Sequence, residues 1–113
     1  MVALSSTVAN WSANFSTAAT GLQMAGAVLN GPGTITNDAG QTLTMSATTI
    51  NAPLVNQGTM VVDGGSGIAG SFSAQNGSVL RVQGDCSYGN GALTVSGGFV
   101  NNGTIELTSV GCG

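Results

Sequence analysis

Short runs in which apolar and polar residues alternate occur along the whole chain. In residues 103–109, Ile105 and Leu107 alternate with threonines and a glutamate. The same period of two recurs in residues 8–16, 33–38, 42–48, 58–63, 70–75, 78–83 and 92–97. Such alternation is typical of strands with one buried face. The intervening "NGPG", "DAGQ", "DGGSG" and "SGG" are turn sequences, so the pattern predicts an all-β protein of short strands.

The first run is open to a second interpretation. As a strand, residues 8–16 place their apolar side chains on one face: Ala9, Trp11, Ala13 and Phe15. An amphipathic helix over residues 4–22 is the alternative, because five apolar residues also fall near helical spacing: Leu4, Val8, Trp11, Phe15 and Leu22. Serine, threonine and asparagine are poor residues for a helix interior. The composition therefore favours the strand.

One phrase recurs in the chain. "LVNQGTMVV" (54–62) returns as "FVNNGTIELTS" (99–109), with a shorter version, "LNGPGTIT" (29–36), and a looser one, "QNGSVLRV" (75–82). The interval from Gly33-Thr34 to Gly58-Thr59 equals that from Asn76 to Asn101, whereas the interval from Gly58 to Gly77 is shorter. A period of about 20–25 residues with glycine corners is typical of a β-solenoid, whose stacked coils pair strand with strand.

The longer interval predicts which residues stack. It places Leu80 over Ile105, Val82 over Leu107, and Arg81 over Glu106, so that the only cation forms an inter-coil ion pair with the only glutamate. We expect a parallel β-solenoid of four to five coils over residues 26–113, preceded by an N-terminal strand or cap over residues 1–25. The predicted inward column is Ile35, Leu43, Met45, Met60, Val62, Leu80, Val82, Leu93, Val95, Ile105 and Leu107.

The repeats also resemble a known class of protein. "VNQGTM", "VNNGTI" and the strand text "QTLTMSATTI" are similar to the repeats of right-handed parallel β-helices in secreted bacterial adhesins, namely autotransporter passengers and filamentous-haemagglutinin-like proteins. The resemblance covers residues 26–109. It implies a right-handed coil and an extended, extracellular, non-catalytic stalk or adhesive fibre.

Charge is nearly absent from the chain. Among 113 residues the charged side chains are Arg81, Asp38, Asp63, Asp85 and Glu106, with no lysine and no histidine. Acid–base catalysis would then depend on perturbed carboxylates alone, and nucleic acid needs several cations to displace its counterions. We therefore predict no enzyme activity, although a glycosidase using these carboxylates is the alternative, and no nucleic-acid partner.

The two cysteines, Cys86 and Cys112, are separated by the longer interval plus one residue. Adjacent strands are about 4.8 Å apart, and a disulfide tolerates Cα separations of about 4.4–6.8 Å. We predict that they form a disulfide between neighbouring coils, as suits an oxidising location. Two free thiols are the alternative.

Other ligand sites are conceivable on the same residues. Asp38, Asp63 and Asp85 each follow a strand, and a calcium column along one edge would use their oxygens. The sequence has no nonapeptide calcium repeat, so turn capping is favoured and no cofactor or metal is predicted. Thr-x-Thr at residues 34–36 and 42–44 suggests an ice-binding array, but the motif is not sustained from coil to coil.

The sequence predicts a structural role at a cell surface. No run approaches the roughly 20 apolar residues of a membrane span. Solenoid ends leave unpaired strand edges, so head-to-tail self-association into a surface fibre is expected. The alternative is an adhesive module that binds a surface glycan through exposed aromatic residues, with Trp11, Phe72, Tyr88 and Phe99 as candidates. We favour the interpretation that Trp11, Phe15 and the other two phenylalanines fill or cap the interior. Either role implies an extracellular or cell-surface location.

Overall fold

Three parallel sheets make up the protein. A computed structural model describes residues 2–18, 21–85 and 91–110, which contain strands and no helix. Sheet A comprises β1 (Val2–Ser5), β4 (Leu22–Ala25), β7 (Thr42–Ser46), β10 (Thr59–Asp63), β13 (Val79–Asp85) and β16 (Thr104–Val110). Sheet B comprises β2 (Val8–Asn10), β5 (Val28–Asn30), β8 (Thr49–Ile50), β11 (Gly65–Ile68) and β14 (Ala92–Val95). Sheet C comprises β3 (Phe15–Ser16), β6 (Ile35–Asn37), β9 (Leu54–Asn56), β12 (Phe72–Ala74) and β15 (Phe99–Asn101).

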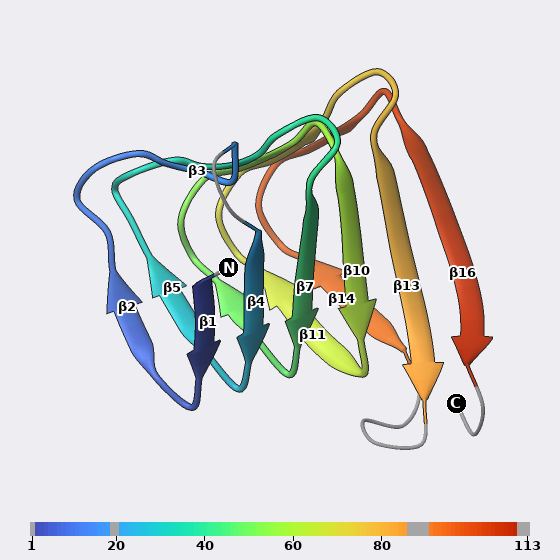
Figure 1. Cartoon of the computed structure of the whole chain (residues 1–113), viewed down its shortest axis with the longest axis horizontal. Coiled ribbons are helices and arrows are strands. Elements are labelled where there is room, and N and C mark those ends of the chain that lie inside the picture. Colours follow the sequence, from blue (N-terminus) through green and yellow to red (C-terminus); the bar gives the residue numbers. More distant parts are fainter. Residues whose placement is uncertain (1, 19–20, 86–90, 111–113) are drawn as a thin grey trace.

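The chain visits the sheets in the fixed order A, B, C, so that five three-strand coils stack and β16 begins a sixth layer (Figure 1). Every strand pair is parallel. This arrangement confirms the predicted parallel β-solenoid. A single coil has no opposing layer to bury its apolar face, so each coil depends on its neighbours for stability.

The register confirms part of the sequence alignment. Leu80 pairs with Ile105, Arg81 with Glu106 and Val82 with Leu107. The other coils are shorter than this one, because Val2 pairs with Leu22, Leu22 with Leu43, Leu43 with Met60, and Met60 with Leu80. The longer interval of the sequence therefore describes only the last coil.

The proposed match of Gly33-Thr34 with Gly58-Thr59 is wrong. Gly33 lies in the corner before β6 of sheet C, where Ile35 pairs with Leu54, whereas Gly58 lies in the corner before β10 of sheet A. Both corners need a glycine for the same reason. A Cβ on Gly33 would overlap the Ala13 carbonyl, and one on Gly58 would overlap the Asp38 carbonyl. Similar text therefore marks two different corners.

The coils begin earlier than the sequence suggested. β1, β2 and β3 pair in parallel with β4, β5 and β6, so coil pairing extends into residues 1–25, where we expected a strand or cap. Residues 8–16 are also not one strand. They turn between β2 and β3. This turn stacks on the corresponding corner of the next coil through two hydrogen bonds of 2.9 Å, from Gly33 N to Trp11 O and from Phe15 N to Thr34 O.

The core is a continuous apolar column through the middle coils. Seven of the predicted inward residues are buried: Ile35, Leu43, Met45, Met60, Val62, Leu80 and Val82. Leu93 and Val95 are partly buried against them. Ile105 and Leu107 lie in the same inward rows, yet they are 43% and 80% exposed. Their predicted burial is wrong because β16 is the last strand of sheet A, and no other described strand covers its far side.

Candidate functional site

A ladder of buried polar side chains runs along the corner between sheets C and A. This buried ladder consists of Thr17, Asn37 and Asn56, each fully buried. Thr17 Oγ1 donates to Asn37 Oδ1 at 3.0 Å, and Asn37 Nδ2 donates to Asn56 Oδ1 at 2.9 Å. Buried amides are tolerated when they are hydrogen-bonded in this way. The ladder ties three successive coils together at one corner.

The two asparagines of the ladder also bind the backbone of sheet A. Asn37 Nδ2 donates to Thr59 O at 2.9 Å, and Asn56 Nδ2 donates to Val79 O at 3.2 Å. Asn37 precedes β7 in the chain and its acceptor lies on β10, the next strand of sheet A. Asn56 precedes β10 and its acceptor lies on β13. Asn56 Oδ1 accepts from Gly58 N at 3.2 Å. The repeated phrase Asn-x-Gly-Thr is thus a corner unit, in which asparagine reaches the next coil and glycine leaves room for the previous one.

A second ladder lies in the corner between sheets B and C, where it faces solvent. Asn30 Nδ2 donates to Asn10 Oδ1 at 2.9 Å, and Asn51 Nδ2 donates to Asn30 Oδ1 at 2.8 Å. Stacked coils are expected to form outward ladders of threonine and asparagine, but the sequence identified neither the residues of this solvent-facing ladder nor the buried ladder. Their signal is the recurrence of asparagine at coil spacing, with Asn10, Asn30 and Asn51 about one coil apart.

The C-terminal end of the solenoid contains an apolar hollow of about 230 Å³. Its lining comes from the last two coils and includes Leu80, Val82, Leu93, Val95, Phe99, Ile105 and Leu107. Phe99 stacks on the buried Phe72 with ring centroids 5.0 Å apart and remains 40% exposed. The hollow is the uncovered end of the core column.

The N-terminal end contains a hollow of about 320 Å³, which is lined by residues 10–15. Trp11 and Phe15 pack with ring centroids 4.7 Å apart, and both are partly exposed. The aromatic candidates for an adhesive face do not lie together in the described part of the chain. Trp11 and Phe99 lie at opposite ends of the solenoid, Phe72 is buried, and Tyr88 lies outside the described residues.

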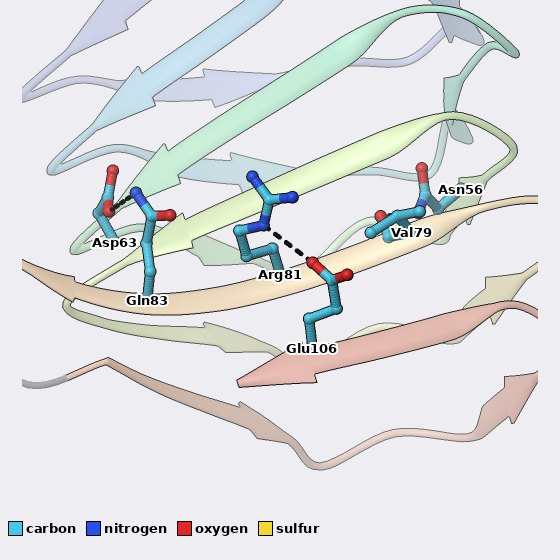
Figure 2. Close-up of polar contacts among 6 residues, drawn as sticks. All are labelled: Asn56, Asp63, Val79, Arg81, Gln83 and Glu106. Carbon is cyan, nitrogen blue, oxygen red and sulfur yellow. Dashed lines mark hydrogen bonds and ion pairs between the residues drawn. The ribbon is translucent and has the colours of Figure 1, made fainter. Parts of the chain in front are cut away.

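Polar contacts cross the outer face of sheet A (Figure 2). Arg81 Nε lies 3.0 Å from Glu106 Oε2, with side chains 42% and 45% exposed. Gln83 Nε2 donates to Asp63 Oδ1 at 2.7 Å. A solvent-exposed ion pair such as Arg81–Glu106 contributes at most about 1 kcal/mol. Each contact links neighbouring coils, the first half-exposed and the second partly buried.

The acidic residues do not share one edge. Asp38 lies in the corner after β6 of sheet C and accepts from Ser16 Oγ at 2.6 Å, whereas Asp63 ends β10 of sheet A. A calcium column along one edge is therefore wrong for these two residues. In the described part of the chain, no group of three or more acidic, histidine or cysteine side chains is placed to hold a metal ion. Cys86 and Cys112 lie outside the described residues, so their disulfide stays a prediction.

Within the described residues, no helix has the length and apolar character needed to cross a bilayer.

Comparison with known proteins identifies the family. No curated protein and no solved structure matches the chain significantly. The sequence model of one family, described as the BigA fourth domain, matches residues 6–112. This match and the parallel β-solenoid fit a repeat protein of a bacterial surface. The chain belongs to the BigA fourth domain family.

Proposed function

We propose that this chain is a non-catalytic structural segment of an extracellular bacterial surface protein, serving as part of a stalk or fibre. The observation that carries the proposal is the uninterrupted apolar column, stacked coil on coil with parallel pairing in all three sheets. Each added coil lengthens such a column by about 4.8 Å. A solenoid therefore spans distance with little sequence complexity, which is what a stalk requires.

The surface chemistry supports the same role. The chain carries five charged side chains in all, and the corners are closed by neutral amide ladders. Neutral ladders keep their hydrogen bonds when ionic strength and pH change, because no ionised group takes part in them. Such a surface suits a protein that stands outside the cell. The family description names a fourth domain, which accords with a segment of a longer chain.

The location is tested on intact cells of the source bacterium. An antibody against the purified chain should label unpermeabilised cells, and protease added outside should remove the label. A cytoplasmic protein should keep its signal under both treatments and serves as the control. Labelling that appears only after permeabilisation would contradict the proposal.

A second role, adhesion to carbohydrate, is favoured by the N-terminal hollow. Trp11 and Phe15 offer aromatic faces there, and Asn10 and Asn14 line the same hollow. Their Oδ1 atoms are already engaged, by Asn30 Nδ2 and Thr34 N respectively. The Nδ2 groups are therefore the donors they would offer to sugar hydroxyls, while aromatic faces suit the apolar face of a sugar ring.

The adhesive role is tested on a glycan array with the purified chain. If it holds, wild type binds a defined glycan, and Trp11→Ala loses that binding by at least tenfold with an unchanged circular dichroism spectrum. Val8→Ala is the matched control, because Val8 is 61% exposed at the same end but does not line the hollow. Absence of binding across the array would leave the structural role alone.

A further inference from the structure

We propose that the C-terminal end of the solenoid receives a further coil of the same polypeptide, which enters as a sheet B strand, continues as a sheet C strand and returns as a sheet A strand. The proposal rests on the structural role proposed above and specifies what that segment joins. Three independent features of the last two coils carry it: their exposed apolar rows, an asparagine that repeats a corner without a further described strand to reach, and the number of strands in each sheet.

The inward rows continue to the end of the solenoid without a change of chemistry. Leu22, Leu43, Met60, Leu80 and Ile105 form one row by register, and Met24, Met45, Val62, Val82 and Leu107 form the next. All are buried except the two on β16. Phe99 continues the third row, where it stacks on Phe72. A chain that ended its stacking here would be expected to turn polar at these positions.

Asn101 repeats the geometry of Asn56. Its Oδ1 accepts from Gly103 N at 3.1 Å, as Asn56 Oδ1 accepts from Gly58 N at 3.2 Å. Asn56 completes the corner by donating Nδ2 to Val79 O on the next sheet A strand. The equivalent acceptor for Asn101 lies on a strand beyond β16, and none of the described strands occupies that position. The corner unit is thus set for one more coil.

The strand count decides which occupant fits. Sheet A has six strands, whereas sheets B and C have five each, so the end is a step and not a flat face. A second copy begins with its own sheet A strand, β1. If β1 of the second copy stacks on β16, one layer of sheets B and C stays vacant between the copies. If β2 and β3 of the second copy stack on β14 and β15 instead, its β1 falls where β16 already lies. Polypeptide continuing from β16 fills the step in order.

The proposal is tested by extending the protein with one of its own coils. Residues 65–85 contain β11, β12 and β13 in the order B, C, A, and a copy of this segment is fused after residue 113. The matched control fuses the same residues in the order A, B, C, with 79–85 placed before 65–78. We expect the first fusion to raise Tm by roughly 5–10 °C and to lower the fluorescence of an apolar-surface dye at least twofold. The control should do neither.

Point variants identify the contact surface. In the extended protein, Leu107→Asp or Asn101→Ala should abolish the gain in Tm. In the unextended chain each should leave Tm within about 2 °C, because both side chains are exposed. Equal stabilisation by both fusions, or no stabilisation by either, would overturn the proposal.

A second copy as the natural occupant is an outcome of the same set of experiments. The sequence led us to expect head-to-tail self-association, but the stepped end does not fit a second copy. Sedimentation of the unextended chain over about a hundredfold range of concentration should therefore show a monomer. Concentration-dependent end-to-end assembly that Leu107→Asp abolishes would overturn the proposal in favour of self-association. These measurements use purified protein, so they fail or succeed independently of the cell-surface labelling that tests the proposed location.

Discussion

Replacement of Asn37 by alanine should destabilise the protein more than any other single change to an uncharged polar side chain among the described residues. The fully buried Asn37 amide takes part in four hydrogen bonds: it accepts from Thr17 Oγ1 and donates to Asn56 Oδ1, to Thr59 O and, at 3.4 Å, to Gln41 O. Alanine removes all four bonds at once, although Gln41 O, the acceptor of the longest one, still accepts from Thr59 N.

The magnitude follows from what each partner retains. Thr17 Oγ1 still accepts from Asp38 N, and Asn56 Oδ1 still accepts from Gly58 N. Those two losses cost about 0.5–1.5 kcal/mol each, whereas the Thr59 carbonyl loses a donor in a buried corner at about 1–3 kcal/mol. With partial relaxation, Asn37→Ala should lower the free energy of unfolding by about 2–4 kcal/mol. Tm should then fall by roughly 10 °C.

Asn30→Ala is the matched control. Asn30 also sits in the middle of an asparagine ladder and bonds a neighbour on either side, Asn10 and Asn51, but that ladder faces solvent. Water replaces the lost bonds there, so the free energy of unfolding should fall by no more than about 0.5 kcal/mol. Urea denaturation followed by far-ultraviolet circular dichroism measures both variants. Equal losses in the two variants would refute the argument that burial makes the ladder stabilising.

Further predictions concern the core, the surface and the cysteines. Leu80→Asp should unfold the protein, because Leu80 is 3% exposed and the new charge would be unpaired, while Leu107→Asp should cost under about 1 kcal/mol at 80% exposure; thermal melts compare the two. Glu106→Gln should lower the free energy of unfolding by under about 1 kcal/mol, because it removes the exposed ion pair with Arg81. The part of the stability that this pair contributes should then no longer depend on salt, which denaturation at low and high salt measures. Unreduced, denatured protein should show no titratable thiol from Cys86 and Cys112; two titratable thiols would disprove the disulfide.

Sequence periodicity predicted the fold because apolar and polar residues alternate along most of the longer strands and glycine-containing turns separate them. It also predicted the pairing of the last coil, since the interval from Asn76 to Asn101 aligns Arg81 with Glu106 as the structure does. It failed for the coil length elsewhere. Gly33 of "GPGTIT" and Gly58 of "NQGTM" are both required because a carbonyl of the preceding coil lies too close for a Cβ. The two corners nevertheless join different sheets, so the similar text does not mark equivalent positions.

Whether a side chain is buried was harder to predict than the face of the sheet on which it lies. Alternation correctly placed Ile105 and Leu107 on the inward side of their strand, but whether an inward residue is covered depends on the next coil and not on its own strand. The opposite error applies to Asn37 and Asn56. Asparagine is ordinarily a surface residue, and only the three-dimensional corner shows that these two amides are buried and hydrogen-bonded to each other.

These two errors have one physical origin, and it explains where function can reside in this molecule. In a solenoid each coil completes the previous one, so a residue's environment is fixed by a neighbour one whole coil away in the sequence. The middle coils satisfy one another and leave little chemistry exposed. Among the described residues, uncovered apolar and polar groups gather at the ends: the Trp11–Phe15 hollow at the start, and the exposed Leu107 with the corner asparagine Asn101 at the finish. Specific contacts with other molecules or with other parts of the polypeptide should therefore concentrate at the ends, and substitutions on the outer faces of the middle coils should change stability without changing those contacts.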